Sequence, residues 1–219
     1  MSQPHPHPPL PLILLPLLII PLPSPLNSQP QPDLPPPLIS IPPIHAETVD
    51  AQKIHINSPG IITLVLKSNQ PLADRTRSIA RSLDDLRGLK EWRLIVVIDF
   101  RNSLANLLPT IVRIQIRSNL DQEAQRLLPY YRSNGNPNSP RHDLHTIADF
   151  DGTIAEALGW NNKPNELAAT LFNTKGYIHR RWSDLHNPQP LRRHLLRLLR
   201  SKNKTPSPHP TPPPTQPHP

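Results

Sequence analysis

The sequence predicts an α/β domain in which helices cover a mixed central β-sheet, and three observations predict it. Apolar β-branched runs alternate with amphipathic segments across residues 51–200. The chain of elements closes with two short strands joined by a glycine turn, followed by a helix. The 33 prolines are segregated, with 16 in residues 1–50, 9 in residues 51–200 and 8 in residues 201–219. We therefore expect one folded domain between two proline-rich segments.

Residues 1–50 are expected to form a leader and a linker, and residues 201–219 a disordered tail. Within the leader, the run from Leu10 to Leu22 is too short and too often interrupted by proline to span a membrane. Its length suits the apolar core of a signal peptide over residues 1–28, although no Lys or Arg precedes it. We expect a secreted or periplasmic protein, with a cytoplasmic one as the alternative.

The first half of the domain is expected to hold three strands and a helix. Gly60–Lys67 is a run typical of a buried strand, and Lys53–Ile56 just before it alternates as an edge strand does. Apolar residues recur every three to four positions in Asp74–Arg87, which predicts a helix that ends at Gly88. The unbroken apolar centre of Trp92–Phe100 indicates a strand buried on both faces.

The middle of the domain is less regular. Leu120–Tyr131 has a helical pattern whose end Pro129 is expected to disturb. Ile111–Ile116 alternates and fits either a strand or part of a longer insertion.

The last third is strongly patterned. A short strand is expected over Leu144–Ala148 and a short helix over Thr153–Gly159. Two strands, Leu167–Phe172 and Tyr177–Trp182, are expected to pair as a hairpin because a turn with glycine joins them. Leucines along one side of Pro190–Arg200 predict a closing helix.

This order of elements resembles the thioredoxin-like fold in its redoxin and peroxiredoxin form, over roughly residues 52–200. The stretch Ala148–Trp160 is similar to the segment of those families in which a strand ends in Asp and a glycine turn opens a short helix. Leu171–Ile178 is similar to their hairpin. The resemblance implies a three-layer sandwich with a mixed central sheet.

The resemblance also implies where a reactive thiol would lie, namely in the loop Ser68–Ala73, and this chain has no cysteine at all. A thiolate is the nucleophile in that chemistry, so thiol–disulfide exchange and peroxidase activity are excluded. The loop is instead a candidate binding site, with the residues Ser68, Asn69, Gln70 and Pro71. Pro164 is the candidate for the cis-proline that these families place before the hairpin, although it lies early relative to Gly176.

A second motif points to a different class. Asp149-Phe-Asp-Gly-Thr153 matches the first motif of haloacid-dehalogenase-type phosphatases, in which the first Asp attacks phosphorus and Mg²⁺ screens the charge. The downstream acids Glu156, Glu166 and Asp184 are never adjacent, and only 66 residues follow Thr153. A structural turn is therefore favoured, and a Mg²⁺-dependent enzyme using Asp149 and Asp151 is an alternative.

Two further clusters have plainer interpretations than a functional site. His142 and His145 would point to opposite faces of an extended segment, so we assign no metal site, and we assign no catalytic residue or cofactor. Residues 51–200 carry 22 basic and 13 acidic side chains, with four arginines on the last helix (Arg192, Arg193, Arg197 and Arg200). No recognition signature accompanies this charge, so nucleic-acid binding is not favoured and is a further alternative.

The sequence thus favours a cysteine-less thioredoxin-like domain without redox activity, which acts as an exported binding or structural protein. Its partner is an unknown protein or small ligand.

Overall fold

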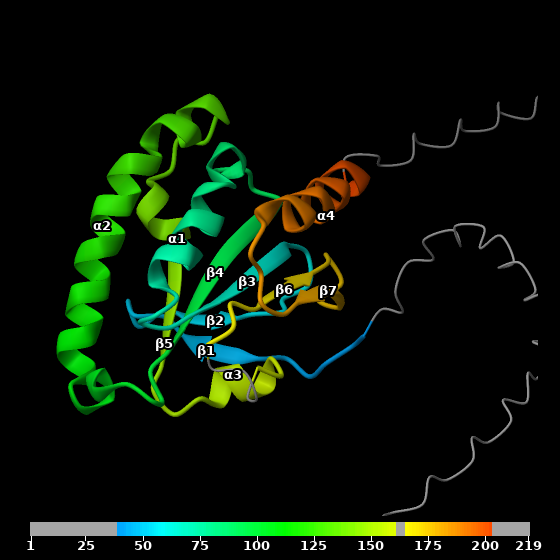
Figure 1. Ribbon diagram of the computed structural model, residues 1–219. Coiled ribbons are helices and arrows are strands. Elements are labelled where there is room, and N and C mark those ends of the chain that lie inside the picture. Colours follow the sequence, from blue (N-terminus) through cyan, green and yellow to red (C-terminus); the bar gives the residue numbers. More distant parts are fainter. Residues whose placement is uncertain (1–38, 161–164, 203–219) are drawn as a thin grey trace, which may run out of the picture. The chain divides into compact units, whose positions relative to one another are not determined.

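The computed structural model describes residues 39–160 and 165–202 (Figure 1). The proline-rich leader, most of the expected linker, Pro164 and the proline-rich tail lie outside these residues, so the predictions made for them are not tested.

The described elements follow the predicted alternation of strands and helices. In chain order they are β1 (His45–Glu47), β2 (Lys53–His55), β3 (Ile62–Ser68), α1 (Ala73–Arg81), the 3-10 turn η1 (Asp84–Leu86), β4 (Trp92–Asp99), η2 (Leu104–Leu107), α2 (Pro109–Ser133), η3 (Pro140–Asp143), β5 (His145–Asp149), α3 (Thr153–Ala157), β6 (Ala169–Phe172), β7 (Ile178–Trp182) and α4 (Pro188–Lys202).

Five of the strands form one mixed sheet in the order β5-β4-β3-β6-β7. β3 runs parallel to β4 and β4 runs parallel to β5, whereas β6 is antiparallel to both β3 and β7. All seven residues of β3 are buried, as its continuous apolar run predicts for a central strand. The mixed central sheet and the terminal hairpin expected from the sequence are therefore confirmed.

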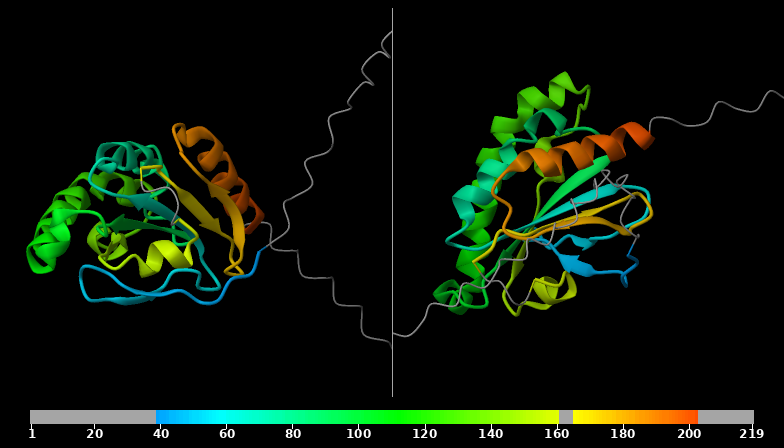
Figure 2. Two further views of the ribbon diagram at one scale, coloured as in Figure 1. Left: turned by 60° about the horizontal axis from the view of Figure 1, so that its bottom comes forward. Right: turned by 45° about the vertical axis from the view of Figure 1, so that its right-hand side comes forward.

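Helices and strands cover the two faces of this sheet (Figures 1 and 2). On one face, α1 and α4 pack their apolar sides against Leu64 and Leu66 of β3, with Ile79, Leu191 and Leu195 as the main contacts from the helices. On the other face, α3 and the residues of β2 pack against Val65 of β3 and its neighbours in β4. Because successive side chains of β3 point to opposite faces of the sheet, they pack into two separate cores.

The segment Lys53–His55 differs from its expected place. It pairs with β1 in a separate two-stranded ribbon and not at the edge of the main sheet. The period-two pattern correctly marks a half-buried strand, but it carries no information on the partner.

The alternative of a strand over Ile111–Ile116 is wrong. These residues form the first half of α2, which begins with Pro109 at its first position, a favoured place for proline. Ile111 and Ile114 are exposed on this helix, together with Leu104, Leu107 and Leu108 just before it. Because the apolar spacing there does not follow a buried helical face, the pattern misleads.

The helix α2 also includes Pro129 and continues to Ser133, so the disturbance expected at Pro129 does not end the helix. Among the described residues, neither α2 nor any other helix is long and apolar enough to cross a membrane.

The helix predicted over Asp74–Arg87 ends at Arg81 and is followed by η1. The break brings the buried Asp84 carboxylate to Arg126 of α2, whose guanidinium donates to both its oxygens at 2.5 and 3.1 Å. Leu83 and Leu86 remain buried, as the periodicity predicts. Tertiary ion pairing has overridden the local helical preference here.

Candidate functional site

The loop after β3, where the resemblance places a thiol, is a compact turn. The Asn69 side chain accepts a hydrogen bond from the backbone N–H of Leu72 at 3.0 Å, which closes the turn at the start of α1. Ser68 is buried, Asn69 is half-buried, and Gln70 and Pro71 are exposed. Of the predicted binding residues, Gln70 and Pro71 are therefore exposed, whereas Ser68 and Asn69 form the buried and hydrogen-bonded part of the turn.

The side chain of Lys67, the residue before Ser68, is 1% exposed, and it points to the opposite face of β3. Burial lowers the pKa of its ammonium group below the ordinary value, while the carboxylates of Asp99 and Glu166 act in the opposite direction. A lysine within a fully buried central strand is rare unless it is paired or functional. The end of β3 thus carries a buried charged group next to Ser68 in the sequence, on the opposite face of the strand.

The neighbouring strand contributes an acid to the same group. Asp99 ends β4, and its carboxylate accepts hydrogen bonds from the Arg101 side chain at 3.0 and 2.7 Å. Burial acts to raise the pKa of this carboxyl, but the bonds from Arg101 outweigh it and the pKa is lowered. Asp99 therefore stays ionised and helps to keep Lys67 charged.

The Lys67 side chain lines a cavity of about 320 Å³ at this end of the sheet. The described residues that line it combine two indole rings, two cationic side chains, one acid and small residues: Lys67, Gly159, Trp160, Glu166, Ala168, Arg181, Trp182 and Ser183. We call it the Lys67 cavity. Aromatic walls with a few charged groups are typical of sites that bind small ligands.

The acidic motif that resembles a phosphatase forms a structural turn. Both carboxylate oxygens of Asp149 accept backbone hydrogen bonds, from Gly152 at 3.1 Å, Ile154 at 3.4 Å and Ala155 at 2.8 Å. Burial raises the pKa of this carboxyl, and the bonds from Ala155 and Ile154 act in the opposite direction. Asp151 caps Thr153 at 3.0 Å, and Asp149 ends β5, which is an edge strand of the sheet. This geometry favours the structural interpretation of the motif.

The histidine and arginine clusters are dispersed. His142 lies in η3 and His145 in β5, and the described residues hold no group of three or more His, Cys, Asp or Glu that could bind a metal ion. On α4, Arg192 is engaged by both oxygens of Asp85 at 2.7 and 2.6 Å. Arg193, Arg197 and Arg200 are exposed along the same helix.

Known proteins similar to this chain are found among solved structures. No protein-family model and no curated protein matches the sequence. Solved structures similar to this chain include a putative thioredoxin from Neisseria meningitidis, with 13% identity, 75% of this chain and 93% of that chain covered, and a TM-score of 0.48. Another is a peroxiredoxin-like protein from Aquifex aeolicus, with 10% identity, 74% and 86% coverage and a TM-score of 0.47.

The fold is thioredoxin-like. A third similar structure is BsSco, a member of the Sco family of cytochrome c oxidase assembly proteins, with 12% identity, 78% and 97% coverage and a TM-score of 0.46. This likeness concerns the fold alone, and no function is carried over from it. In this chain, the loop where the resemblance implies a thiol holds Ser68 to Pro71, and Lys67 precedes it.

Sequence reasoning located the loop but missed the charged group behind it. In the sequence, Lys67 is the last residue of one expected strand and Asp99 lies within the next. The available signal was a lysine within a run of β-branched and leucine residues, where a charge is costly to bury. Its partner Glu166 lies 99 positions further on, and no local pattern links the two.

Proposed function

We propose that this protein binds a ligand without redox chemistry, and that the Lys67 cavity is its binding site. The absence of cysteine from the whole sequence supports the first part, since thiol–disulfide exchange needs a thiolate. The observation that carries the second part is the buried Lys67 side chain at the end of the central strand, opening onto a cavity of about 320 Å³. The export expected from the leader remains a prediction.

The chemistry of the cavity favours a particular kind of ligand. Lys67 and Arg181 carry positive charge and Glu166 carries one negative charge, so an anionic group is favoured. The indole rings of Trp160 and Trp182 offer apolar faces for a flat ring. We therefore propose a small ligand, or a side chain of a protein partner, with an aromatic body and an acidic group.

The fluorescent probe 8-anilinonaphthalene-1-sulfonate, an aromatic sulfonate, tests this site in the folded protein. We expect saturable binding that weakens by about tenfold in Lys67→Met, because a hydrogen bond to a charged group contributes roughly 1.5–3 kcal/mol. Trp182→Ala should weaken it as well, through loss of the ring contact. Probe fluorescence measured against protein concentration gives both dissociation constants.

The exposed apolar residues at the start of α2 provide the matched control. Leu108→Ser and Ile111→Ser remove other apolar surface that could attract the probe, and they should leave its affinity unchanged. The proposal is wrong if these two changes abolish binding while Lys67→Met and Trp182→Ala, both still folded by circular dichroism, bind as the unmodified chain does.

A further inference from the structure

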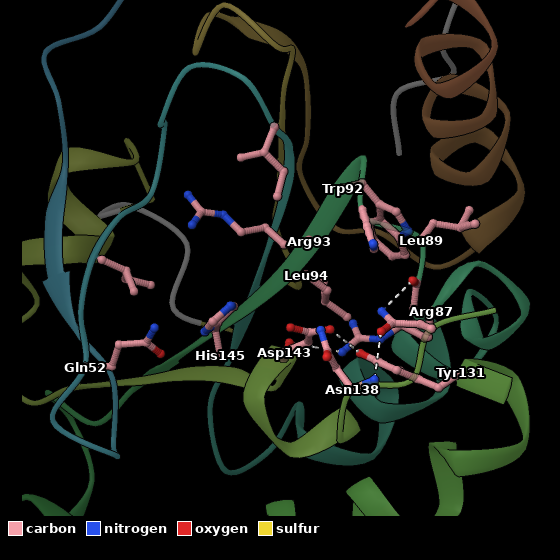
Figure 3. Close-up of a pocket in the computed structure, with 15 residues that line it drawn as sticks. Gln52, Arg87, Leu89, Trp92, Arg93, Leu94, Tyr131, Asn138, Asp143 and His145 are labelled. Carbon is pink, nitrogen blue, oxygen red and sulfur yellow. Dashed lines mark hydrogen bonds between the residues drawn. The ribbon is translucent and has the colours of Figure 1, made fainter. Parts of the chain in front are cut away.

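A second cavity, of about 340 Å³, lies at the other end of the sheet (Figure 3). Trp92 and Leu94 line it, and they pair with Ile62 and Leu64 at the beginning of β3, whereas Ser68 is the last residue of that strand. The cavity is therefore separated from the candidate loop by the length of the central strand.

Arg87 is the main feature of this cavity. Arg87 is 5% exposed, and burial lowers the pKa of its guanidinium. Its guanidinium donates a hydrogen bond to the backbone carbonyl of Asp143 at 3.4 Å, interacts with the Tyr131 hydroxyl, and lies 5.8 Å from the centre of the Trp92 ring. Among the described residues, no carboxylate lies within ion-pair distance of it. Five N–H donors with so few acceptors leave capacity for an anion.

The groups around Arg87 strengthen this interpretation. Tyr131, Asn138 and Asp143 lie beside the Arg87 guanidinium (Figure 3). The Asp143 carboxylate is already engaged, because it accepts a hydrogen bond from the Tyr131 hydroxyl at 3.0 Å. Its charge still acts on Arg87, because Tyr131, Asp143, Asp84 and Glu123 all oppose the lowering of the Arg87 pKa by burial.

Arg93 and His145 lie on the other side of the same space (Figure 3). The Arg93 guanidinium is bound by neutral oxygens, including the Thr63 hydroxyl at 3.1 Å and the Ile56 carbonyl at 3.1 Å. With the exposed Lys90, the lining holds three cationic side chains and the single acid Asp143.

We infer that this cavity binds the phosphate group of a small molecule. Guanidinium groups recognise phosphate through paired charged hydrogen bonds, and Asn138 and His145 add neutral polar groups. The volume is that of a small-molecule site, and Trp92 with Leu89 offers apolar surface for the rest of the molecule. This inference does not depend on the proposed function, because none of the residues lining this cavity lines the Lys67 cavity.

The three tryptophans allow the two sites to be measured separately. Trp92 lines this cavity, and Trp160 and Trp182 line the other. In the variant Trp160→Phe/Trp182→Phe, Trp92 is the sole tryptophan and reports on this cavity alone. Inorganic phosphate, phenyl phosphate and succinate are titrated at constant ionic strength, with chloride as the blank.

We expect a saturable change in Trp92 fluorescence with both phosphates, and tighter binding of phenyl phosphate than of inorganic phosphate. Arg87→Met should weaken phosphate binding by at least about tenfold, because a charged hydrogen bond contributes roughly 1.5–3 kcal/mol. Lys90→Ala, at an exposed position where folding is not at risk, should weaken it several-fold. Arg193→Met, on the exposed face of α4, is the control and should change nothing.

Sulfate, which keeps its charge across the neutral and mildly acidic range, gives a second readout. Burial lowers the pKa of His145, with Arg93 and Arg87 acting in the same direction and Asp143 and Asp50 against it. A bound dianion opposes that shift, so sulfate should bind more tightly as the pH falls, and His145→Gln should remove this dependence.

The inference is overturned if phosphate gives no saturable signal at millimolar concentrations, or if Lys90→Ala and Arg87→Met bind phosphate as tightly as the unmodified residues do. Tighter binding of succinate than of either phosphate would overturn the assignment to phosphate. Failure here leaves the Lys67 cavity unaffected, since the probe assay on that cavity uses Trp182 and Lys67.

Discussion

Replacing Asp149 by alanine is expected to lower the free energy of unfolding by about 4 kcal/mol, since each buried donor left without a partner costs roughly 1–3 kcal/mol. The Asp149 side chain accepts hydrogen bonds from three backbone N–H groups of the turn that opens α3. Asp149 is itself 3% exposed, so water does not replace the carboxylate freely. Urea unfolding followed by circular dichroism gives the measurement.

Two further variants show what kind of role Asp149 has. Asp149→Asn keeps one acceptor oxygen and should cost less than alanine. Asp151→Ala removes an exposed cap of Thr153 and should cost about 1 kcal/mol. If Asp149→Asn left stability unchanged but abolished a Mg²⁺-dependent phosphatase activity of the chain, the phosphatase alternative would replace the structural interpretation.

Gly176→Ala is expected to destabilise the protein by about 3 kcal/mol or more, because it combines a strained backbone with a steric clash. Gly176 has a φ of +78° in the turn between β6 and β7. A Cβ atom there would lie 2.3 Å from the backbone carbonyl oxygen of Asn57, in a segment that cannot move without disturbing β2 and β3. The shift in the urea midpoint at constant slope measures the loss.

Gly60→Ala is the matched control for this variant. Gly60 also has a positive φ, of +91°, but no atom lies within 4 Å of an added Cβ. Only the backbone cost of about 1–2 kcal/mol is therefore expected. Equal losses for the two glycines would show that the contact with Asn57 yields, and that the hairpin is not fixed against the preceding strand.

Much of the fold was predictable because its cores are encoded locally. The strand run that became β3 and β4 and the leucine stripe of α4 are apolar patterns that require burial whatever surrounds them. The errors arise where distant contacts decide. Asp84 pairs with Arg126, 42 residues away, and this pairing accompanies the early end of α1. The alternation in Ile111–Ile116 is overridden by the helix that Pro109 begins.

The candidate site was predictable only in part, for a similar reason. Ser68 to Pro71 followed from the resemblance in element order, since a loop after a central strand is a local feature. The charged group behind it needs Lys67, Asp99 and Glu166 from three separate segments, which only the folded sheet brings together. The second cavity, around Arg87, likewise joins the loop after η1 with β4 and η3, and no local pattern in the sequence links these segments.

The central claim, that the Lys67 cavity is a ligand site in a scaffold without redox chemistry, can be observed at the lysine itself. In carbon-13 NMR spectra of the lysine side chains, Lys67 is assigned with the Lys67→Met variant and followed while 8-anilinonaphthalene-1-sulfonate is added. We expect the Lys67 Cε resonance to shift in proportion to the bound fraction, while that of the exposed Lys175 stays unchanged. Saturation of the probe with no change at Lys67 would contradict the claim.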